Sequence, residues 1–412
     1  MIDIDAPRTA SITPKRIVFV APFGLGEKTT VWARTLPLAR QLVDHGYTVT
    51  IVIPPWDTPA DSGRSWQDGS VQIINVALRG GLLLVLWRMM CTLTRLRPDI
   101  VHIVKPRAHA GLVQWWLWQR RRLRGKGPLI LLDVDDWEQA WAEVNNYPPL
   151  VARFLAWQEE WGIRHADGIT AASHWLVERV NAYAPATPLC YLPNAVTPPN
   201  NIAPADFRSA DFASADITST QRAGAQILFY SRYVEVSPEW LATFWNVLHA
   251  LQPDATLVVF GDALQVGRTL QFQQTMTELA SAAATAVCWQ PYRPDLVDAL
   301  YRSSACAIFP SLPGPLLEAK CSVKLATTML QGVPVVASAV GEQQYYGANG
   351  AATLVPPSAT PAEFAEIVAQ VLATPRHHRR QQANALERLL QRYDRRTLGQ
   401  TLAAFYQPLL EH

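Results

Sequence analysis

The stretch FPSLPGPLLEAKCSVKLATTMLQGVPVVASAVGEQQYY, residues 309–346, decides the fold of this chain. It predicts the end of a strand, a Pro/Gly loop, a short helix over residues 322–331, a helix stop at Gly332 and a buried strand over residues 334–338. A loop that opens a helix between two parallel strands presents unpaired backbone N–H groups, which can bind an anion. We therefore expect a phosphate-bearing ligand in this stretch.

The composition is that of a globular protein with more than one core. The chain has 412 residues, of which 49% are hydrophobic and 17% charged, so two domains are expected. The formal net charge of +2 gives no argument for nucleic acid, and no nucleic-acid partner is predicted. Scattered cysteines without metal-type pairing, and an N-terminus without an apolar signal core, predict a cytoplasmic protein.

Strands and helices alternate along most of the chain. In the first half, strands are predicted at 16–22, 49–54, 71–76, 100–104 and 129–134, with helices at 29–44, 82–95, 110–122, 149–166 and 174–182. The alternation restarts with strands at 226–231, 255–261, 285–289 and 305–310, and helices at 238–251, 269–283 and 296–302. This pattern predicts an α/β fold with two Rossmann-like doubly wound domains that face a central cleft.

The predicted domain boundaries follow from where the alternation stops. They are an N-terminal tail 1–15, a first Rossmann-like domain 16–197, a linker or loop 198–224, a second Rossmann-like domain 225–375 and C-terminal helices 376–412. We expect these last helices to pack back on the first domain.

Several motifs, in this order, resemble the GT-B glycosyltransferases of family 4, the retaining glycogen-, sucrose- and mannosyl-transferase-like group. The motifs are Phe23-Gly-Leu-Gly26, Pro98-Asp-Ile-Val-His102, Ala166-Asp-Gly-Ile-Thr-Ala-Ala-Ser173, Leu192-Pro-Asn-Ala-Val196, Ile227-Leu-Phe-Tyr-Ser-Arg232 and Gly332-Val-Pro-Val-Val-Ala-Ser338. The resemblance implies a first domain for the acceptor and a second for a nucleotide sugar. It also implies retaining transfer of a hexosyl unit to a glycan or lipid-linked acceptor, a role in polysaccharide biosynthesis, and no cofactor.

The chain departs from the family at charged positions of the donor site. The family carries an arginine and, a few residues later, a lysine that hold the donor diphosphate; Arg232 matches the first, but the second falls near Ser237. The family's two glutamates, separated by seven residues, fall at Ala319 and Thr327. Glu318 is one residue out of register with the first of them, and the second would grip the nucleotide ribose.

Other residues are candidates for supplying the missing charge. Lys320 and Lys324 flank the helix start at Ser322, so they can hold the donor diphosphate together with the helix N-terminus, or they are solvated helix-start charges. Gly24 and Gly26 either let the first loop approach the donor closely or form a simple turn.

The catalytic candidates are Arg232 and Asp135. The planar guanidinium of Arg232 suits bidentate stabilisation of the leaving diphosphate, unless it is a surface arginine. The run Asp133-Val-Asp-Asp136 resembles a metal-binding motif, but that motif serves a different glycosyltransferase fold, so no metal is predicted. The family often has His-Asp here, and Asp135 takes the place of the histidine. Asp135 would then orient the acceptor or stabilise charge on the sugar, with Asp136 on the acceptor side; the alternative is an Asp that caps the next helix.

The remaining candidates lie in loops and on helices. Lys105 and Arg107 follow a strand and would hold an anionic acceptor, whereas His102 lies within that strand and is predicted to be a core histidine. Glu342 occupies a loop that in the family touches the donor. Residues 82–90 and 115–124 mix Trp with Arg, which favours either peripheral contact with an anionic membrane or ordinary core packing.

Two other functions stay open from the sequence. The missing Glu and Lys favour a catalytically degenerate GT-B protein that binds a nucleotide, a carbohydrate or a partner. A nucleotide-sugar 2-epimerase on the same fold is the other alternative, and it would form product from the donor alone.

Overall fold

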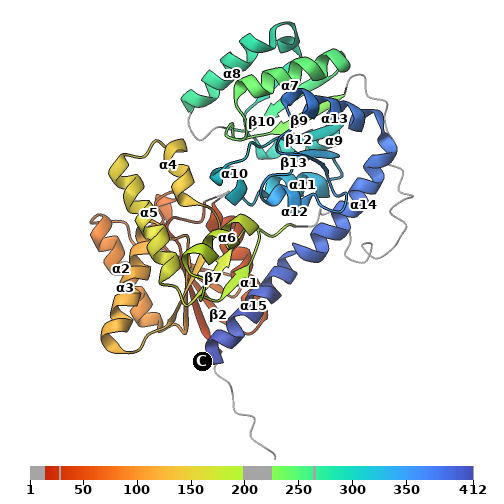
Figure 1. Ribbon diagram of the computed structural model, residues 1–412. Helices are drawn as coiled ribbons and strands as arrows, with labels where there is room; N and C mark the ends of the chain where they lie inside the picture. Colours follow the sequence, from red (N-terminus) through yellow and green to blue (C-terminus); the bar gives the residue numbers. More distant parts are fainter. Residues whose placement is uncertain (1–13, 27–28, 198–224, 263–265, 412) are drawn as a thin grey trace, which may run out of the picture. The chain divides into compact units, whose positions relative to one another are not determined.

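The computed structural model describes residues 14–26, 29–197, 225–262 and 266–411 (Figure 1). The predicted linker 198–224 lies outside the described residues, as do residues 1–13 of the predicted N-terminal tail. The chain divides into two compact units. The first comprises Met1–Asp133, His165–Gly168 and Gly399–His412, and the second comprises Val134–Arg164 and Ile169–Leu398. Three boundaries between the units therefore lie inside the stretch 16–197, after Asp133, Arg164 and Gly168.

Among the described residues, the first eight strands follow the order β3-β4-β2-β1-β5-β6-β7-β8. They are β1 (Arg16–Val20), β2 (Thr48–Ile53), β3 (Ser65–Asp68), β4 (Val71–Asn75), β5 (Ile100–Val104), β6 (Leu129–Val134), β7 (Gly168–Ala171) and β8 (Leu189–Tyr191). The central strand β1 pairs in parallel with both β2 and β5. Parallel neighbours need crossover helices, and helices on both faces explain why the central strands are apolar throughout.

A second sheet has the order β11-β10-β9-β12-β13-β14 within the described part of the chain, with parallel pairing throughout. Its strands are β9 (Gln226–Tyr230), β10 (Thr256–Phe260), β11 (Val287–Gln290), β12 (Cys306–Phe309), β13 (Val335–Ser338) and β14 (Thr353–Val355). The chain is therefore an α/β protein with two largely parallel sheets, as the alternation of strands and helices predicted.

The helices follow the strands in sequence. Up to residue 197 they are α1 (Leu36–Asp44), α2 (Leu82–Leu96), α3 (Ala108–Arg124), α4 (Trp141–Val144), α5 (Pro149–Arg164) and α6 (His174–Tyr183). From residue 225 they are α7 (Pro238–Leu251), α8 (Val266–Ala280), α9 (Val297–Ser303), α10 (Pro315–Ala319), α11 (Val323–Leu330), α12 (Glu342–Tyr346), α13 (Pro361–Ala373), α14 (Pro375–Arg392) and α15 (Arg395–Glu411). A π-helical turn over Val31–Thr35 precedes α1.

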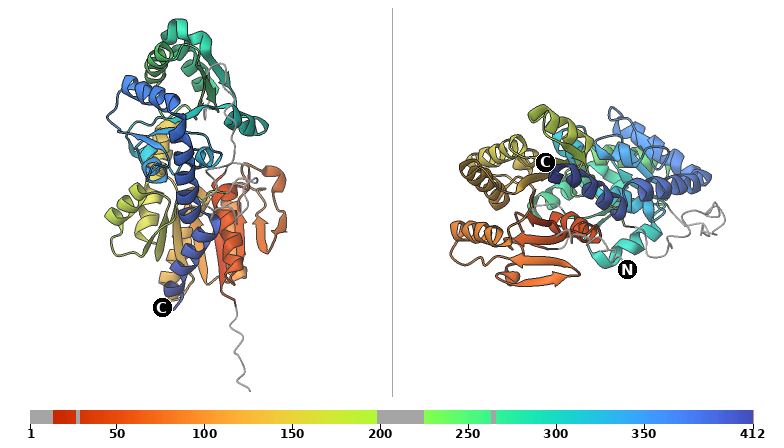
Figure 2. Two further views of the ribbon diagram at one scale, coloured as in Figure 1. Left: turned by 90° about the vertical axis from the view of Figure 1, so that its right-hand side faces the viewer. Right: turned by 90° about the horizontal axis from the view of Figure 1, so that it is seen from below.

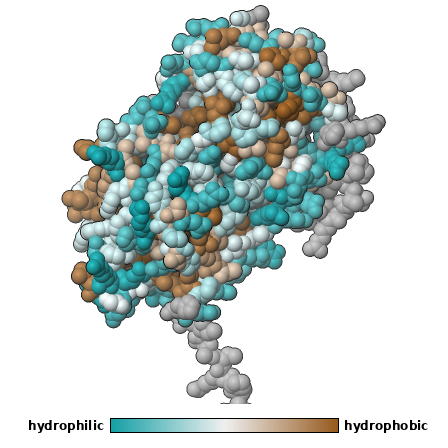
Figure 3. Space-filling model, viewed as in Figure 1, coloured by the Kyte–Doolittle hydropathy of each residue, from teal (hydrophilic) through white to brown (hydrophobic). Residues whose placement is uncertain are grey.

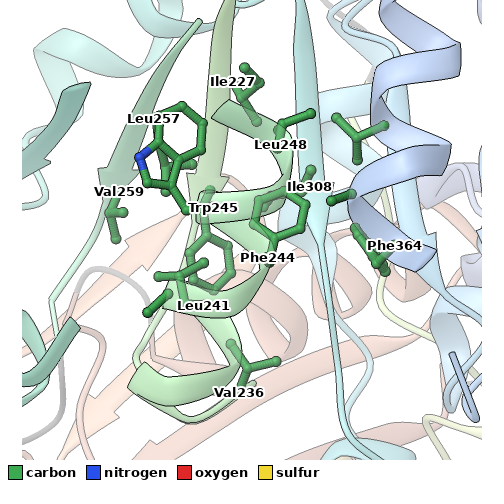
Figure 4. Close-up of a cluster of buried hydrophobic side chains, with 14 of the residues drawn as sticks. Ile227, Val236, Leu241, Phe244, Trp245, Leu248, Leu257, Val259, Ile308 and Phe364 are labelled. Carbon is green, nitrogen blue, oxygen red and sulfur yellow. The ribbon is translucent and has the colours of Figure 1, made fainter. Parts of the chain in front are cut away.

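The core of the second sheet is built from aromatic and branched side chains. Phe244 and Trp245 of α7 lie over the sheet, where Leu257 and other strand residues face them (Figure 4). Phe364 of α13 meets Phe244 edge to face, with ring centroids 5.8 Å apart. The buried indole of Trp245 donates its N–H to the Ala283 carbonyl at 2.8 Å, so the large side chain is buried without an unpaired donor.

The end of the chain belongs to the first unit. Its residues from Gly399 lie beside α1, as Figures 1 and 2 show. The hydroxyl of Tyr406 is 2.6 Å from Nδ1 of His102, which is buried as predicted. Burial lowers the pKa of His102 to about 4, so this histidine is neutral near pH 7.

The sequence missed the short elements. These are β3, β8, β14, α4, α10 and α12, all of five residues or fewer. β3 pairs antiparallel with β4 at the sheet edge, and its polar sequence SWQD lacks the apolar run of the buried strands. Elements this short have too few residues to show the spacing of apolar residues that is typical of a helix or a strand.

Candidate functional site

The quoted stretch folds as a strand, a loop with two short helices, and a second strand. β12 and β13 pair in parallel, with Ala307 opposite Val335, and α11 lies between them in sequence. α11 ends before Gly332, whose φ of +77° is the left-handed conformation that favours glycine. At its other end, the N-cap Ser322 makes no side-chain capping hydrogen bond. The Ser322 hydroxyl therefore leaves the first-turn N–H groups of α11 available to another acceptor.

A pocket lies beside the N-terminus of α11. We call it the lysine pocket and define it by Tyr230, Glu235, Lys320, Ser322, Lys324 and Gln343. It brings together the sequence-predicted residues Lys320, Ser322 and Lys324. Thr327 is half-buried on α11 and does not line this pocket.

Glu235, which the sequence analysis missed, is the buried anion of the lysine pocket. Its carboxylate forms an ion pair with Lys320 at 3.1 Å and accepts hydrogen bonds from Ser231 Oγ at 2.8 Å and the Arg232 N–H at 3.0 Å. Burial alone would raise the pKa of Glu235, but Lys320, Lys324 and these hydrogen bonds outweigh it and lower the pKa. The signal that could have found Glu235 is a carboxylate three residues after Arg232 in the loop that follows a strand.

The loop after β9 has a constrained backbone. Tyr233 has a φ of +62°, which costs energy for a residue with a Cβ. Gly261 has a φ of +137°, and a Cβ there would lie 2.0 Å from the carbonyl oxygen of Ser231. The end of β10 therefore needs a glycine so that the loop carrying Arg232 and Glu235 can pass.

Cations surround this loop. The Nζ atom of Lys324 lies 4.2 Å from the centroid of the Tyr230 ring, a cation–π contact. Arg232 is half-buried, and its guanidinium forms no hydrogen bond or ion pair with another described residue. Lys320, in contrast, is neutralised by Glu235. The charge of Lys324 also helps to lower the pKa of Glu235, so both lysines of the pocket interact with this carboxylate.

A second pocket, with a volume of about 270 Å³, is lined in part by Glu318 of α10. We call it the aromatic pocket and define it by His174, Trp175, Glu178, Glu318, Gly341 and Tyr345. The predicted donor residue Glu318 lines this pocket and not the lysine pocket. Gly341 has a φ of +50°, and a Cβ there would lie 2.6 Å from the carbonyl oxygen of Glu318, so only glycine fits.

Glu342 is completely buried and holds α6 and β8 to α12. Its Oε1 accepts a hydrogen bond from the backbone N–H of His174 at 2.7 Å and lies 2.8 Å from Nδ1 of the same residue, while Oε2 accepts one from the Tyr191 hydroxyl at 2.7 Å. Burial and the charge of Glu342 raise the pKa of Tyr191, which keeps its hydroxyl a donor. The His174 ring also stacks on Tyr345, with centroids 3.6 Å apart. The structure therefore places Glu342 in a buried network beside the aromatic pocket.

The aspartates after β6 have separate environments. Asp133 is buried and receives two hydrogen bonds of 2.7 Å from Arg34, a residue the sequence analysis did not single out. Asp135 is buried at the strand's carboxyl end, and Asp136 is half-buried. Among the residues that the structure describes, no three acidic, cysteine or histidine side chains gather as a metal site requires.

Glu159 of α5 caps the helical turn that follows Asp135 and Asp136. The backbone N–H groups of Glu138 and Gln139 donate to the two carboxylate oxygens of Glu159 at 2.8 and 3.1 Å. Burial, together with the charge of Glu138, raises the pKa of Glu159 to about 8. Glu159, and no residue that the sequence singled out, therefore accepts these two backbone hydrogen bonds.

The predicted glycine loop and the acceptor-side cations belong to the first unit. The N–H of Gly24 donates to the carboxylate of Asp57, and a Cβ at Gly24 would lie 2.5 Å from that side chain. A Cβ at Gly26 would lie 2.8 Å from the same carboxylate. Both glycines therefore allow the close approach of Asp57. Lys105 is buried with a φ of +61°, and Arg107 is the half-buried N-cap residue of α3.

Comparisons with known families cover most of the chain. The model described as Glycosyl transferase 4-like domain matches residues 29–195, and the model described as Glycosyl transferases group 1 matches residues 224–374. The comparison with curated proteins returned no match.

Solved structures resemble nearly the whole chain at low sequence identity. Sucrose-phosphate synthase from Thermosynechococcus elongatus is 16% identical with a TM-score of 0.69, covering 96% of this chain and 99% of that one. HepE of Anabaena in complex with UDP-glucose is 16% identical with a TM-score of 0.60, covering 96% and 100%. The catalytic domain of starch synthase IV from Arabidopsis thaliana, bound to ADP and acarbose, is 12% identical with a TM-score of 0.68, covering 97% and 100%. These likenesses show a shared fold.

Proposed function

Because the chain belongs to the GT-B glycosyltransferases of the family 4 type, we propose that it transfers a hexosyl unit from a nucleotide-diphosphate sugar, with retention, to a glycan or lipid-linked acceptor. The observation that carries the proposal is the lysine pocket, where Lys324 and the uncapped N-terminus of α11 lie together. A helix N-terminus beside a lysine is suited to a phosphate group. The nucleotide sugar is a substrate, and no metal or other cofactor is part of the proposal.

The charges of the lysine pocket are exchanged relative to those expected from the family. A glutamate is expected at position 319, and the chain has Lys320 beside it; a lysine is expected near Ser237, and the chain has Glu235 in that loop. The pair Lys320–Glu235 thus supplies one charge of each sign to the pocket, each from a loop. We assign Lys324 and Arg232 to the donor diphosphate, with Arg232 stabilising it as the leaving group.

The aromatic pocket supports a sugar ligand. The carboxylates of Glu178 and Glu318 can accept hydrogen bonds from sugar hydroxyl groups, and the rings of Trp175 and Tyr345 offer apolar surface to the C–H face of a sugar ring. The pocket lies beside α10, which also borders the lysine pocket through Leu317 and Lys320. This neighbourhood suits a donor whose diphosphate and hexosyl groups occupy adjacent pockets.

We propose that the acceptor binds at the carboxyl ends of β5 and β6. These strands pair in parallel, so their carboxyl ends lie at the same edge of the sheet, where ligands bind in α/β proteins. Lys105 and Arg107 follow β5 and would hold an anionic acceptor, such as a lipid diphosphate. Asp135 and Asp136 follow β6, and we assign Asp135 to the reacting sugar and Asp136 to the acceptor. All five cysteines are free thiols, which fits the cytoplasm.

Calorimetry with UDP, GDP and ADP and their sugars tests the donor assignment. We expect one nucleotide series to bind, and R232Q to weaken binding about ten-fold or more, since it removes a charged contact to phosphate. R379Q on α14 is the matched control and should leave binding unchanged. No binding of any nucleotide, or equal binding by R232Q, would contradict the proposal.

Transfer assays then separate the alternatives. Product that needs both donor and acceptor, with its anomeric configuration retained by NMR, is expected. Nucleotide binding without turnover on any glycan or lipid-linked acceptor would favour a degenerate binding protein. Conversion of the donor alone into an isomer would favour the 2-epimerase.

A further inference from the structure

The segment from β4 to β6 carries a strong local positive charge. Between residues 77 and 128 the single acidic residue is Asp99, whereas the basic residues are Arg79, Arg88, Arg95, Arg97, Lys105, Arg107, Arg120, Arg121, Arg122, Arg124 and Lys126. The whole chain has a formal net charge of only +2. This imbalance creates a local field that attracts an anionic surface.

The same segment exposes large apolar side chains. At the start of α2, Leu82, Leu83, Leu84 and Trp87 are 64%, 82%, 45% and 56% exposed; we call these four residues the leucine turn. On α3, Leu123 is 86% exposed. Figure 3 shows apolar side chains at the left-hand edge, where Figure 1 draws α2 and α3. Exposed leucines in a row are unfavourable in water and indicate a surface that another apolar phase covers.

The leucine turn is held in place by its neighbours. The Leu82 carbonyl oxygen lies 3.2 Å from Nε2 of His109 on α3, and Arg88 donates to the Ala77 carbonyl at 2.7 Å. Farther along, Arg120 of α3 donates to Thr94 of α2 at 3.3 Å. The apolar side chains therefore project from a fixed pair of helices, and docking need not order a loose loop.

Tryptophan and arginine side chains lie together on α3. The guanidinium of Arg120 is 5.3 Å from the centroid of the Trp116 ring, and that of Arg122 is 5.4 Å from the Trp118 ring. Amphipathic indole and guanidinium groups are typical of the boundary between lipid headgroups and acyl chains. Among the described helices, none is long and apolar enough to cross a membrane.

We propose that α2 and α3 form a docking face for an anionic lipid bilayer, in which the leucine turn enters the headgroup boundary and the arginines contact lipid phosphates. A nucleic-acid backbone offers leucine side chains no apolar surface to pack against, whereas a bilayer does. The combination of positive charge and exposed leucines therefore favours lipid over nucleic acid as the ligand. The inference goes beyond the proposed transfer reaction, because docking would occur with either class of acceptor.

Co-sedimentation of the full chain with lipid vesicles tests this inference. We expect binding to vesicles of phosphatidylcholine mixed with phosphatidylglycerol, at least about ten-fold weaker binding to phosphatidylcholine alone, and loss of binding at high salt. Equal binding to both vesicle types, or none to either, would overturn the proposal.

Two variants separate the apolar and the charged contributions. L82Q/L83Q/L84Q should weaken vesicle binding about ten-fold or more, because three apolar side chains no longer enter the lipid. R122Q/R124Q should weaken it by about thirty-fold, since each cation near an anionic surface contributes about 1 kcal/mol and about 1.4 kcal/mol is a factor of ten. The controls L251Q/L270Q and R379Q/R380Q change exposed leucines and arginines of α7, α8 and α14 and should bind like the wild type.

The outcomes distinguish docking from the transfer reaction. Nucleotide binding by L82Q/L83Q/L84Q should equal that of the wild type, because the lysine pocket lies in the second unit and α2 in the first. Wild-type vesicle binding by the leucine variant would overturn the proposal even if transferase activity is found. Preferential binding to duplex DNA, insensitive to the leucine substitutions, would assign the charged face to nucleic acid instead.

Discussion

Lys320 and Glu235 form an ion pair across the lysine pocket, with Nζ and Oε1 3.1 Å apart. The side chains are only 20% and 11% exposed, so the pair is screened less than a surface pair. Glu235 also accepts a hydrogen bond from the N–H of Arg232. One carboxylate therefore neutralises a lysine and fixes the loop that carries Arg232, which couples the stability of the pocket to its ability to bind a donor.

The substitution E235Q tests this coupling. We expect unfolding to require about 1.5–3 kcal/mol less free energy, since the hydrogen bonds from Ser231 and Arg232 lose a charged acceptor. Chemical denaturation measures the change. A double-mutant cycle with K320M isolates the interaction free energy between Glu235 and Lys320. The control E239Q, on the exposed start of α7, should be close to wild type. Wild-type stability of E235Q, or strictly additive effects in the cycle, would contradict the assigned pair.

The substitution K324M tests the role of Lys324 as a phosphate contact. Methionine keeps an apolar chain against Tyr230 but removes the charge, so the affinity for a nucleoside diphosphate should fall about ten-fold or more, and that for the nucleoside much less. Calorimetry with both ligands gives the comparison. K126M, an exposed lysine of the first unit, is the control. An equal loss for nucleoside and diphosphate would mean that the pocket was reshaped and that Lys324 does not contact phosphate.

The regular elements could be predicted from the sequence because each carries its own signal. The strand Ile100–Val104 and the helix Pro238–Leu251 have the predicted bounds, since an apolar run and a Ser-Pro helix start are local features. The stop of α11 at Gly332 is equally local.

The contacts of the site could not be predicted, because they join residues far apart in sequence. Glu235 meets Lys320, and Glu159 caps residues 138 and 139, only after the chain has folded. Sequence spacing made Glu318 a donor-binding candidate, but it could not show that Glu318 lines the aromatic pocket while Lys320, two residues later, lines the lysine pocket.

The substitution E342Q tests the buried network between α6, β8 and α12. An amide offers one acceptor oxygen and an NH₂ group, so at least one of the donors from His174 and Tyr191 loses its partner. We expect unfolding to require about 2–4 kcal/mol less free energy, the cost of an unsatisfied buried donor plus the lost charged acceptor. Chemical denaturation checks this, with E366Q on the exposed face of α13 as the control. A change as small as that of E366Q would show that the network is not needed.

Glu159 predicts a pH dependence of stability that can be isolated from other groups. Its pKa is raised from 4.5 to about 8 by burial, so the folded state retains a proton that the unfolded state has released. The stabilising contribution of Glu159 is therefore fully present below pH 4.5 and is lost as the pH rises through about 8. Over this range the free energy of unfolding should fall by up to about 1.4 kcal/mol per pH unit.

The window between pH 6.5 and about 8 is the useful one for this test. His102, whose pKa is lowered from 6.5 to about 4, adds a slope of the opposite sign that fades as the pH rises above 6.5, and this slope is common to the wild type, E159Q and E160Q. The free energy of unfolding should fall across this window in the wild type and in the neighbouring control E160Q, and the fall should be smaller in E159Q, which has no ionisable group at this position. The same slope in E159Q and E160Q would mean that Glu159 is already ionised in the folded protein, and that its two backbone hydrogen bonds outweigh the effect of burial.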